Sequence, residues 1–190
     1  VLLLTGPTSG RDIFVNNEAG DNSRNGRTAR AVGELGGPVR SISKALTLAR
    51  AGDRVVIAKT DTPYHEGITL QAGRHSGTPE QPFEVVGNGA ILNGRVKVPP
   101  RGWQHFRGNV FRYRPKKTAH QLLFLGNKLA KRKQVKDPNQ LPTLAALEWC
   151  LFRRHLYFCV ENGKLPDDYD VQHTGRSVGI TLYEVRNVVI

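Results

Sequence analysis

Short apolar segments, separated by Gly- and Pro-containing turns, recur through the first 94 residues. Their lengths and composition predict strands over residues 13–15, 54–58, 68–70, 83–86 and 90–92. Strands this short do not suit a sandwich built from long hairpins. They fit the faces of a parallel β-helix, in which each coil supplies one strand per face and stacks about 4.8 Å above the previous coil.

One segment has helical periodicity instead. Its apolar side chains fall at positions i, i+3, i+4 and i+7, and they are Ile42, Ala45, Leu46 and Ala49. This predicts a helix from Ser41 to Ala51, with Ser41 as N-cap, Arg50 favouring the C-terminal end and Gly52 as the left-handed residue that closes it. Because the first coil of a β-helix has an exposed apolar interior, this helix is expected to cover it. Residues 16–38, rich in Gly, Asn and Arg, are expected to form a long loop.

The pattern changes between residues 95 and 172, where most of the aromatic residues occur. Strands are expected there over residues 109–114, 121–125, 149–153 and 156–160, and the earlier rhythm returns at 179–183 and 187–190. The predicted fold class is mainly β, a helix-capped start of a right-handed parallel β-helix with an insertion. The predicted domains are an N-terminal strand, loop, capping helix and first coils over 1–94, an inserted β-rich basic subdomain over 95–172, and coils over 173–190 that continue beyond Ile190.

The chain begins without Met, at Val1-Leu2-Leu3-Leu4. This apolar start is either the tail of a signal-peptide apolar region or an ordinary first strand. The longest apolar run is far shorter than the roughly 20 residues that a membrane-spanning helix needs, so no membrane span is predicted.

The charge of the chain is unevenly distributed. The 190 residues carry a net charge of +12, and the segment from Val85 to Lys136 contains thirteen Lys or Arg and no Asp or Glu. A block of one sign creates a field that recruits polyanions and weakens with salt. The alternative is a solvated face whose counter-charges lie elsewhere in the fold or in sequence outside this chain.

Four motifs follow one another in the first part of the chain: Asp12–Val15, Gly20-Asp21, Gly37–Leu46 and Ala51–Ile57. They resemble the N-terminal cap of secreted bacterial right-handed β-helix proteins of the pectate-lyase-like superfamily. Ser41 stands where that pattern usually has Thr, and Ala51 where it has Pro. Further matches are Pro63–Glu66, Ser76–Pro79, Pro82–Val85 and Gly89–Gly94, with Asn93 in place of the commoner Asp. The resemblance implies a fold and not an activity, because lyases, hydrolases, epimerases and adhesins share this architecture.

The sequence offers few candidates for catalysis or metal binding. Gly175–Gly179 matches the G-x-S-x-G string, but strand-like sequence follows it where a nucleophile elbow requires a helix. The cluster Asp167, Asp168 and Asp170 offers oxygen ligands for Ca²⁺, or else forms a solvated turn. His65-Glu66 is expected to be structural. We assign no metal site and leave the catalytic residues unknown.

The resemblance implies that the cleft lies on coils after Ile190. Family members use paired carboxylates there, or a basic residue with or without Ca²⁺. The chain itself therefore needs no cofactor, and Ca²⁺ would belong to those later coils. Whether it belongs to an enzyme stays open; if so, we expect a polysaccharide lyase or glycoside hydrolase.

We interpret the chain as the N-terminal part of an extracellular or periplasmic, carbohydrate-active protein that acts on or binds a polyanionic polysaccharide. Arg can fork onto carboxylate or sulfate, and aromatic rings can stack on sugars. The candidate polyanion-binding residues are Arg107, Arg112, Arg114, Lys116, Lys117, Lys131, Arg132 and Lys133. The neighbouring aromatics Trp103, Phe106, Phe111 and Tyr113 either contact sugar or form a small core. A non-enzymatic adhesin or structural β-helix is the alternative, which the downstream sequence would distinguish; the capped β-helix pattern argues against a nucleic-acid binder.

The cysteines, Cys150 and Cys159, occur in a predicted hairpin with Arg154-His155 as its loop. In that register, residues whose numbers sum to 309 face each other, so the cysteines form a non-hydrogen-bonded pair with Cα atoms about 4.5 Å apart. A disulfide could then form in an oxidising compartment. Arg-His is a poor tight turn, and a different loop would shift the register; two buried free thiols are the alternative.

Overall fold

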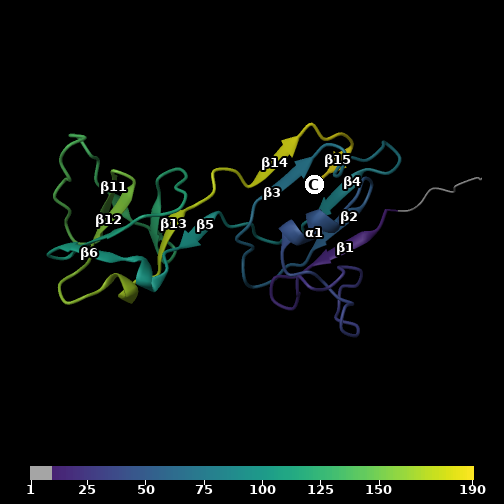
Figure 1. The fold of residues 1–190 in the computed structure, drawn as a ribbon, viewed down its shortest axis with the longest axis horizontal. Helices are drawn as coiled ribbons and strands as arrows, with labels where there is room; N and C mark the ends of the chain where they lie inside the picture. The colour runs from purple at the N-terminus through teal and green to yellow at the C-terminus, as the bar shows by residue number, and fades with distance from the viewer. Residues whose placement is uncertain (1–9) are drawn as a thin grey trace, which may run out of the picture. The chain divides into compact units, whose positions relative to one another are not determined.

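The computed structural model describes residues 10–190, and the predicted element at Val1–Leu4 lies outside them. In this part of the chain the protein is mainly β, with fifteen strands in several sheets, one α-helix and two short 3-10 helices (Figure 1). Two compact units are formed. Unit 1 comprises residues 10–93 and 178–190, and unit 2 is Gly94–Ser177. Between residues 10 and 190, no helix is long and apolar enough to cross a membrane.

Unit 1 is built from parallel strand pairs. One sheet has the order β1 (Asp12–Val15), β2 (Arg54–Ile57), β4 (Phe83–Val86) and β15 (Val188–Val189), and a second pairs β3 (Ile68–Gln71) with β14 (Ile180–Tyr183). In the first sheet Ile13, Val55 and Val85 share one register row, and all three are buried. The predicted strand at 90–92 is reduced to a single parallel bridge between Tyr64 and Leu92.

The parallel pairing continues across the insertion. The chain leaves unit 1 after Asn93, and on its return β14 pairs in parallel with β3, so that Ile180 faces Ile68. Within unit 2, β5 (Arg95–Lys97) pairs with β13 (Val171–Thr174), and the Gly175 N–H donates to the Gly94 carbonyl at 3.1 Å. Gly94, the first residue of the insertion, and Gly175, near its end, are therefore hydrogen-bonded neighbours. Strand β13 (Val171–Thr174) belongs to unit 2.

The predicted helix is present as α1 (Ile42–Leu48), which is shorter than predicted. Ser41 is its N-cap, as predicted, and its hydroxyl accepts the Lys44 N–H at 3.1 Å. The Glu66 carboxylate accepts the next two free N–H groups, from Ile42 at 3.0 Å and Ser43 at 2.9 Å. Glu66 thus has the structural role expected of it, since the first turn of a helix leaves such donors unpaired.

The helix ends one turn early because the Asp53 carboxylate binds the chain that follows it. Asp53 is buried and accepts the Arg50 N–H at 2.8 Å, while Ala49 is already extended. Arg11 donates to the same carboxylate through its backbone N–H at 3.0 Å and through Nη2 at 2.6 Å. Gly52 has the predicted positive φ of 71°, but it belongs to this turn and not to the helix cap.

Unit 2 consists of two antiparallel-rich sheets on one core. The larger has the order β10 (Lys131–Arg132), β11 (Glu148–Phe152), β12 (His155–Cys159), β7 (Val110–Tyr113) and β6 (Gln104–Arg107). The smaller has the order β5, β13, β8 (Leu123–Leu125) and β9 (Lys128–Leu129). The 3-10 helices are η1 (Pro100–Gly102) and η2 (Pro166–Asp168). Trp149 and Phe158 from the first sheet pack with Leu123 and Val171 from the second.

The predicted hairpin is confirmed, but its loop is wrong. The turn is Arg153-Arg154, and Phe152 faces His155, so the facing residue numbers sum to 307. Cys150 therefore faces Tyr157 and not Cys159, and both cysteines are free and buried. A shift of two residues leaves every side chain on the same face of the sheet, so the alternation of polar and apolar residues does not distinguish the two registers.

The helix packing predicts a specific cost for a truncation at Leu46, which lies on the buried face of α1. Leu46→Ala should lower the free energy of unfolding by about 2–5 kcal/mol, because it leaves a cavity in the core. Urea denaturation measures this. Thr47→Ala, at the adjacent exposed position, should change stability little; equal effects of the two substitutions would contradict the packing of α1.

The Asp53 contacts predict a pH dependence of stability. Burial opposes ionisation of Asp53, but the hydrogen bonds from Arg11 and Arg50 outweigh it and lower the pKa of Asp53 below its ordinary value of 3.8. A carboxyl whose pKa is lowered by folding stabilises the native state above the unfolded pKa, and this contribution is lost as the pH falls through the folded pKa.

Asp53→Asn should therefore lower the free energy of unfolding by about 1–3 kcal/mol at neutral pH. It should also flatten the loss of stability below about pH 4. Asp12→Asn is the control, because Asp12 pairs with Arg54 at an exposed site and surface pairs contribute little. A pH profile of Asp53→Asn that parallels the wild type would contradict the role of this carboxylate.

The revised register predicts the state of the cysteines. Burial raises the pKa of Cys150 to about 11 and also raises that of Cys159, so both should react slowly with thiol reagents in the native protein. After unfolding under non-reducing conditions, titration should find two free thiols. A protein that shows thiols only after reduction would contradict this register.

Candidate polyanion-binding surface

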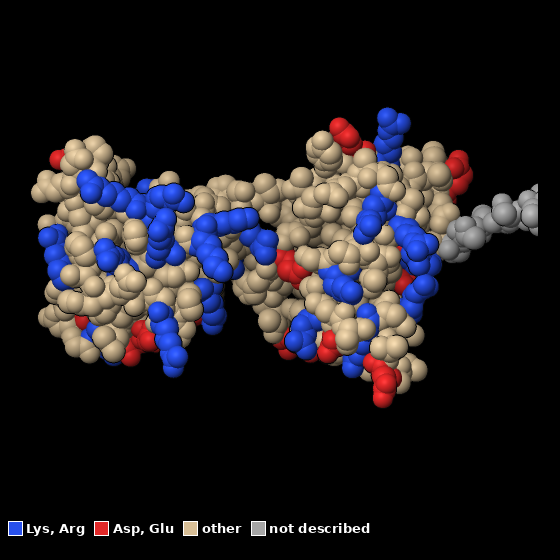
Figure 2. Space-filling view, in the orientation of Figure 1, with Lys and Arg blue, Asp and Glu red and all other residues tan. Residues whose placement is uncertain are grey.

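Unit 2 holds nearly all of the net positive charge. It contains seventeen Lys or Arg and six Asp or Glu, so it carries +11 of the +12 of the whole chain. Figure 2 shows Lys and Arg spread over much of the visible face of this unit, with few acidic residues among them. The counter-charges that the alternative interpretation requires are therefore not supplied by unit 2 itself.

Two acidic residues of unit 2, Glu148 and Asp170, are engaged by nearby side chains. Glu148, buried on β11, pairs with Lys131 Nζ at 2.8 Å and accepts the Ala145 N–H at 3.0 Å, and these hydrogen bonds lower the pKa of Glu148. Asp170 lies 3.2 Å from Lys97 Nζ and also accepts the Gln172 amide at 2.8 Å. Lys131 thus neutralises a buried carboxylate, in addition to its predicted role toward a polyanion.

The predicted binding residues fall into two groups. The first lies at the β6–β7 edge of the larger sheet and in the segment after it, and comprises Arg107, Arg112, Arg114, Lys116 and Lys117. All of these are exposed except Arg112, which is half-buried and donates from Nε to Gln104 Oε1 at 3.3 Å. The β6–β7 hairpin that presents Arg107 was not predicted, because residues 104–107 are polar on most positions.

The second group, Lys131, Arg132 and Lys133, lies at and just beyond β10 on the opposite edge of the same sheet. Two strands, β11 and β12, separate it from β7. The Arg132 guanidinium lies 5.7 Å from the centre of the Trp149 ring and hydrogen-bonds to Gln121. Arg107 and Arg112 thus lie at one edge of the larger sheet and Lys131 and Arg132 at the other, while Arg114, Lys116 and Lys117 lie in the segment between β7 and β8.

The aromatic residues near the first group serve different purposes. Trp103, Phe111 and Tyr113 are half-buried against the core of unit 2, so the core interpretation is correct for these three. Phe106 differs, since 38% of it is exposed on β6. Among the four aromatics named from the sequence, Phe106 is thus the one whose ring is available to a ligand.

Sequence reasoning missed two further cations, Arg153 and Arg154. Both are exposed in the β11–β12 turn, and their φ values are 46° and 66°. This conformation is uncommon for residues other than glycine. Placing Arg153 and Arg154 in the turn requires the correct register of the β11–β12 hairpin. The alternation of polar and apolar residues does not determine that register.

The remaining sequence candidates do not form a catalytic or metal site. Strand β13 precedes Gly175–Gly179 and strand β14 follows, so the helix of a nucleophile elbow is missing. Asp168 accepts the Leu165 N–H at 2.8 Å in the turn after Pro166. Within residues 10–190, no group of three or more His, Cys, Asp or Glu is arranged to hold a metal ion.

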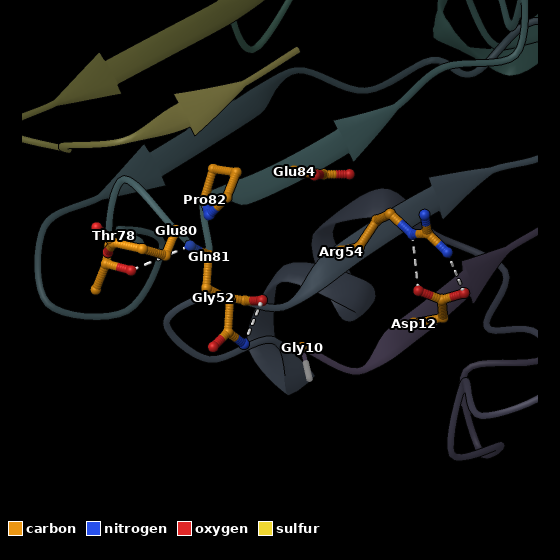
Figure 3. Close-up of a pocket in the computed structure, with 9 residues that line it drawn as sticks. All are labelled: Gly10, Asp12, Gly52, Arg54, Thr78, Glu80, Gln81, Pro82 and Glu84. Atoms are coloured by element: carbon orange, nitrogen blue, oxygen red, sulfur yellow. Dashed lines mark hydrogen bonds and ion pairs between the residues drawn. The ribbon is translucent and has the colours of Figure 1, made fainter. Parts of the chain in front are cut away.

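Unit 1 has a polar depression of about 680 Å³ on the outer side of its first sheet (Figure 3). Asp12, Arg54 and Glu84 come from β1, β2 and β4 and share one register row. Arg54 forks onto Asp12 with distances of 2.8 and 2.7 Å, and this hydrogen bonding raises the pKa of Arg54. This row of charged residues links three parallel strands. The guanidinium of Arg54 is already engaged by the Asp12 carboxylate.

Comparison with known proteins bears on the fold alone. No protein-family model and no curated protein sequence matches this chain. A solved structure described as "The complex structure of XylC with xylose" matches with a TM-score of 0.58 and 15% sequence identity. The match covers 94% of this chain, which spans only 34% of the XylC chain. At this identity the likeness shows a shared β-rich fold, found in a protein that was solved with a sugar.

Proposed function

We propose that this chain is the N-terminal part of an extracellular or periplasmic carbohydrate-active protein, of polysaccharide lyase or glycoside hydrolase type, whose unit 2 binds a polyanionic polysaccharide. The observation that carries the proposal is the concentration of +11 of net charge in unit 2. Such a surface attracts a flexible polyanion over a distance of about 8–10 Å at moderate salt. The arginines of the β6–β7 edge add fork-like donors that match carboxylate or sulfate groups.

Unit 1 supports the architecture that goes with this function. We propose that it forms the helix-capped first coils of a right-handed parallel β-helix. Its strand pairs are parallel, its buried residues align in register rows, and the buried face of α1 (Ile42, Ala45 and Leu46) joins the same core. The exposed apolar residues Ile180, Leu182 and Val189 on β14 and β15 suit the stacking of a further coil.

Two motifs of the family resemblance also have clear physical roles here. Asp53 of the Ala51–Ile57 motif accepts hydrogen bonds from Arg11 at the start of β1 and from Arg50 after α1, and Glu66 of the Pro63–Glu66 motif caps α1. Such roles belong to a fold and do not distinguish an enzyme from a non-enzymatic adhesin. The adhesin is the second candidate, in which the same basic surface binds a partner and the later coils carry no catalytic carboxylates or bases.

The proposal is tested by retention on a column of anionic polysaccharide. Charge reversal at Arg114, Lys116 and Lys117 should lower the salt concentration needed for elution markedly, because binding through several ion contacts depends steeply on salt. The matched control reverses three exposed cations of unit 1, Arg27, Arg30 and Lys59, and changes the total charge equally.

The control variant should elute close to the wild type. If the two variants elute together, retention reflects total charge and not a surface of unit 2, and the proposal is wrong. Wild-type protein that elutes at low salt from the polysaccharide column would contradict it equally. Circular dichroism spectra of both variants, recorded alongside, establish that each has kept its fold.

A further inference from the structure

The larger sheet of unit 2 has a second face that does not contact the central core. Because side chains alternate along a strand, Trp149, Phe158 and Phe111 share one face and lie toward the core. Tyr157, Arg112 and Gln104, which occupy the next register row, point to the other side. Part of this second face is covered by Leu144 and its neighbours, whereas β6 is exposed along its whole length.

Phe106 stands at a bulge on that open side. The register of β6 against β7 shifts between His105 and Arg107, so Phe106 is the extra residue. Such bulges redirect a side chain. The Phe106 ring packs edge-on against Tyr157, with centroids 5.1 Å apart and an interplanar angle of 80°, and remains 38% exposed.

Two guanidinium groups flank this ring. The Cζ atoms of Arg107 and Arg112 lie 5.5 and 6.0 Å from its centroid. Gln104 holds Arg112 through the hydrogen bond to Nε, which orients the fork. Exposed apolar carbon and two sets of bidentate donors are therefore available within one small area.

The same face continues to a third arginine. Phe152 packs against Tyr157 with centroids 6.1 Å apart, and Arg153 Cζ lies 5.2 Å from the Phe152 ring. The row Phe106, Tyr157 and Phe152 thus has arginines at both ends. Arg153 and Arg154 both have a positive φ, a backbone conformation that residues other than glycine rarely adopt. Backbone strain of this kind recurs at binding sites.

We propose that this surface binds an acidic sugar, with the C–H face of a pyranose ring on Phe106 and its carboxylate or sulfate held by Arg107 and Arg112. This rests on the proposed function and specifies its site. A uronic acid or sulfated sugar carries the apolar face and the acid on one ring, which matches the short separation between Phe106 and the two guanidinium groups. In a nucleotide, the ribose separates the stacking base from the phosphate, and the fit is poorer.

The test compares three polyanions of equal charge on the full chain: a short oligosaccharide of uronic acids, inorganic polyphosphate and single-stranded oligothymidylate. Phe106→Ala should weaken binding of the uronic acid oligosaccharide about tenfold, as truncation of a central aromatic contact does. It should leave polyphosphate binding unchanged, because polyphosphate has no ring to stack. Phe106→Tyr should restore the affinity. Leu129→Ala, which removes an exposed apolar side chain from the other sheet, should have no effect.

Each other result overturns the inference. Unchanged affinity of Phe106→Ala for the oligosaccharide would remove Phe106 from the site, while retained polyphosphate binding would leave the proposed function intact. An equal loss for polyphosphate would show that Phe106 supports only the fold, and an equal loss for oligothymidylate would favour a nucleic acid. Failure of the wild type to bind either the oligosaccharide or polyphosphate would instead contradict the proposed function itself.

Discussion

Unit 1 depends on one buried carboxylate, that of Asp53. This carboxylate accepts hydrogen bonds from Arg11, at the start of β1, and from Arg50, in the turn that follows α1. The backbone carbonyl of Asp53 in addition accepts the N–H of Glu84 on β4 at 3.0 Å. Burying a carboxylate is costly unless it is paired and hydrogen-bonded, and here four donors meet it. Because three strands and the end of the helix meet at this group, their register is set together.

Side-chain hydrogen bonds also stabilise the first turn and the last turn of α1. Glu66 accepts the free N–H groups of its first turn, while His75 reaches its last turn, with Nε2 3.0 Å from the Leu46 carbonyl oxygen. The other ring nitrogen of His75 accepts the Gln71 N–H at 3.0 Å on β3. A helix of seven residues is too short to be stable alone, so these contacts and its buried apolar face maintain it.

Unit 2 combines a high positive charge with a stable core by separating the two. Its core consists of aromatic and aliphatic side chains from both sheets, whereas its cations lie on strand edges, turns and the second face of the larger sheet. Repulsion among these cations opposes folding, and a bound polyanion would relieve it. The surface around Phe106 would then gain affinity from charge, and selectivity from the ring that the bulge exposes.

The sequence by itself determined the elements whose cause is local: the amphipathic stripe and Ser41 cap of α1, the short apolar strands of unit 1, and the excess of cations between Val85 and Lys136. Only the tertiary structure decided which cations share a surface, where α1 ends and which residue faces Cys150. These depend on strand pairing and on contacts between residues far apart in the chain, such as Arg11 with Asp53. A side-chain pattern of period two is unchanged by a register shift of two residues, so the hairpin that separates Cys150 from Cys159 could be fixed only by its packing.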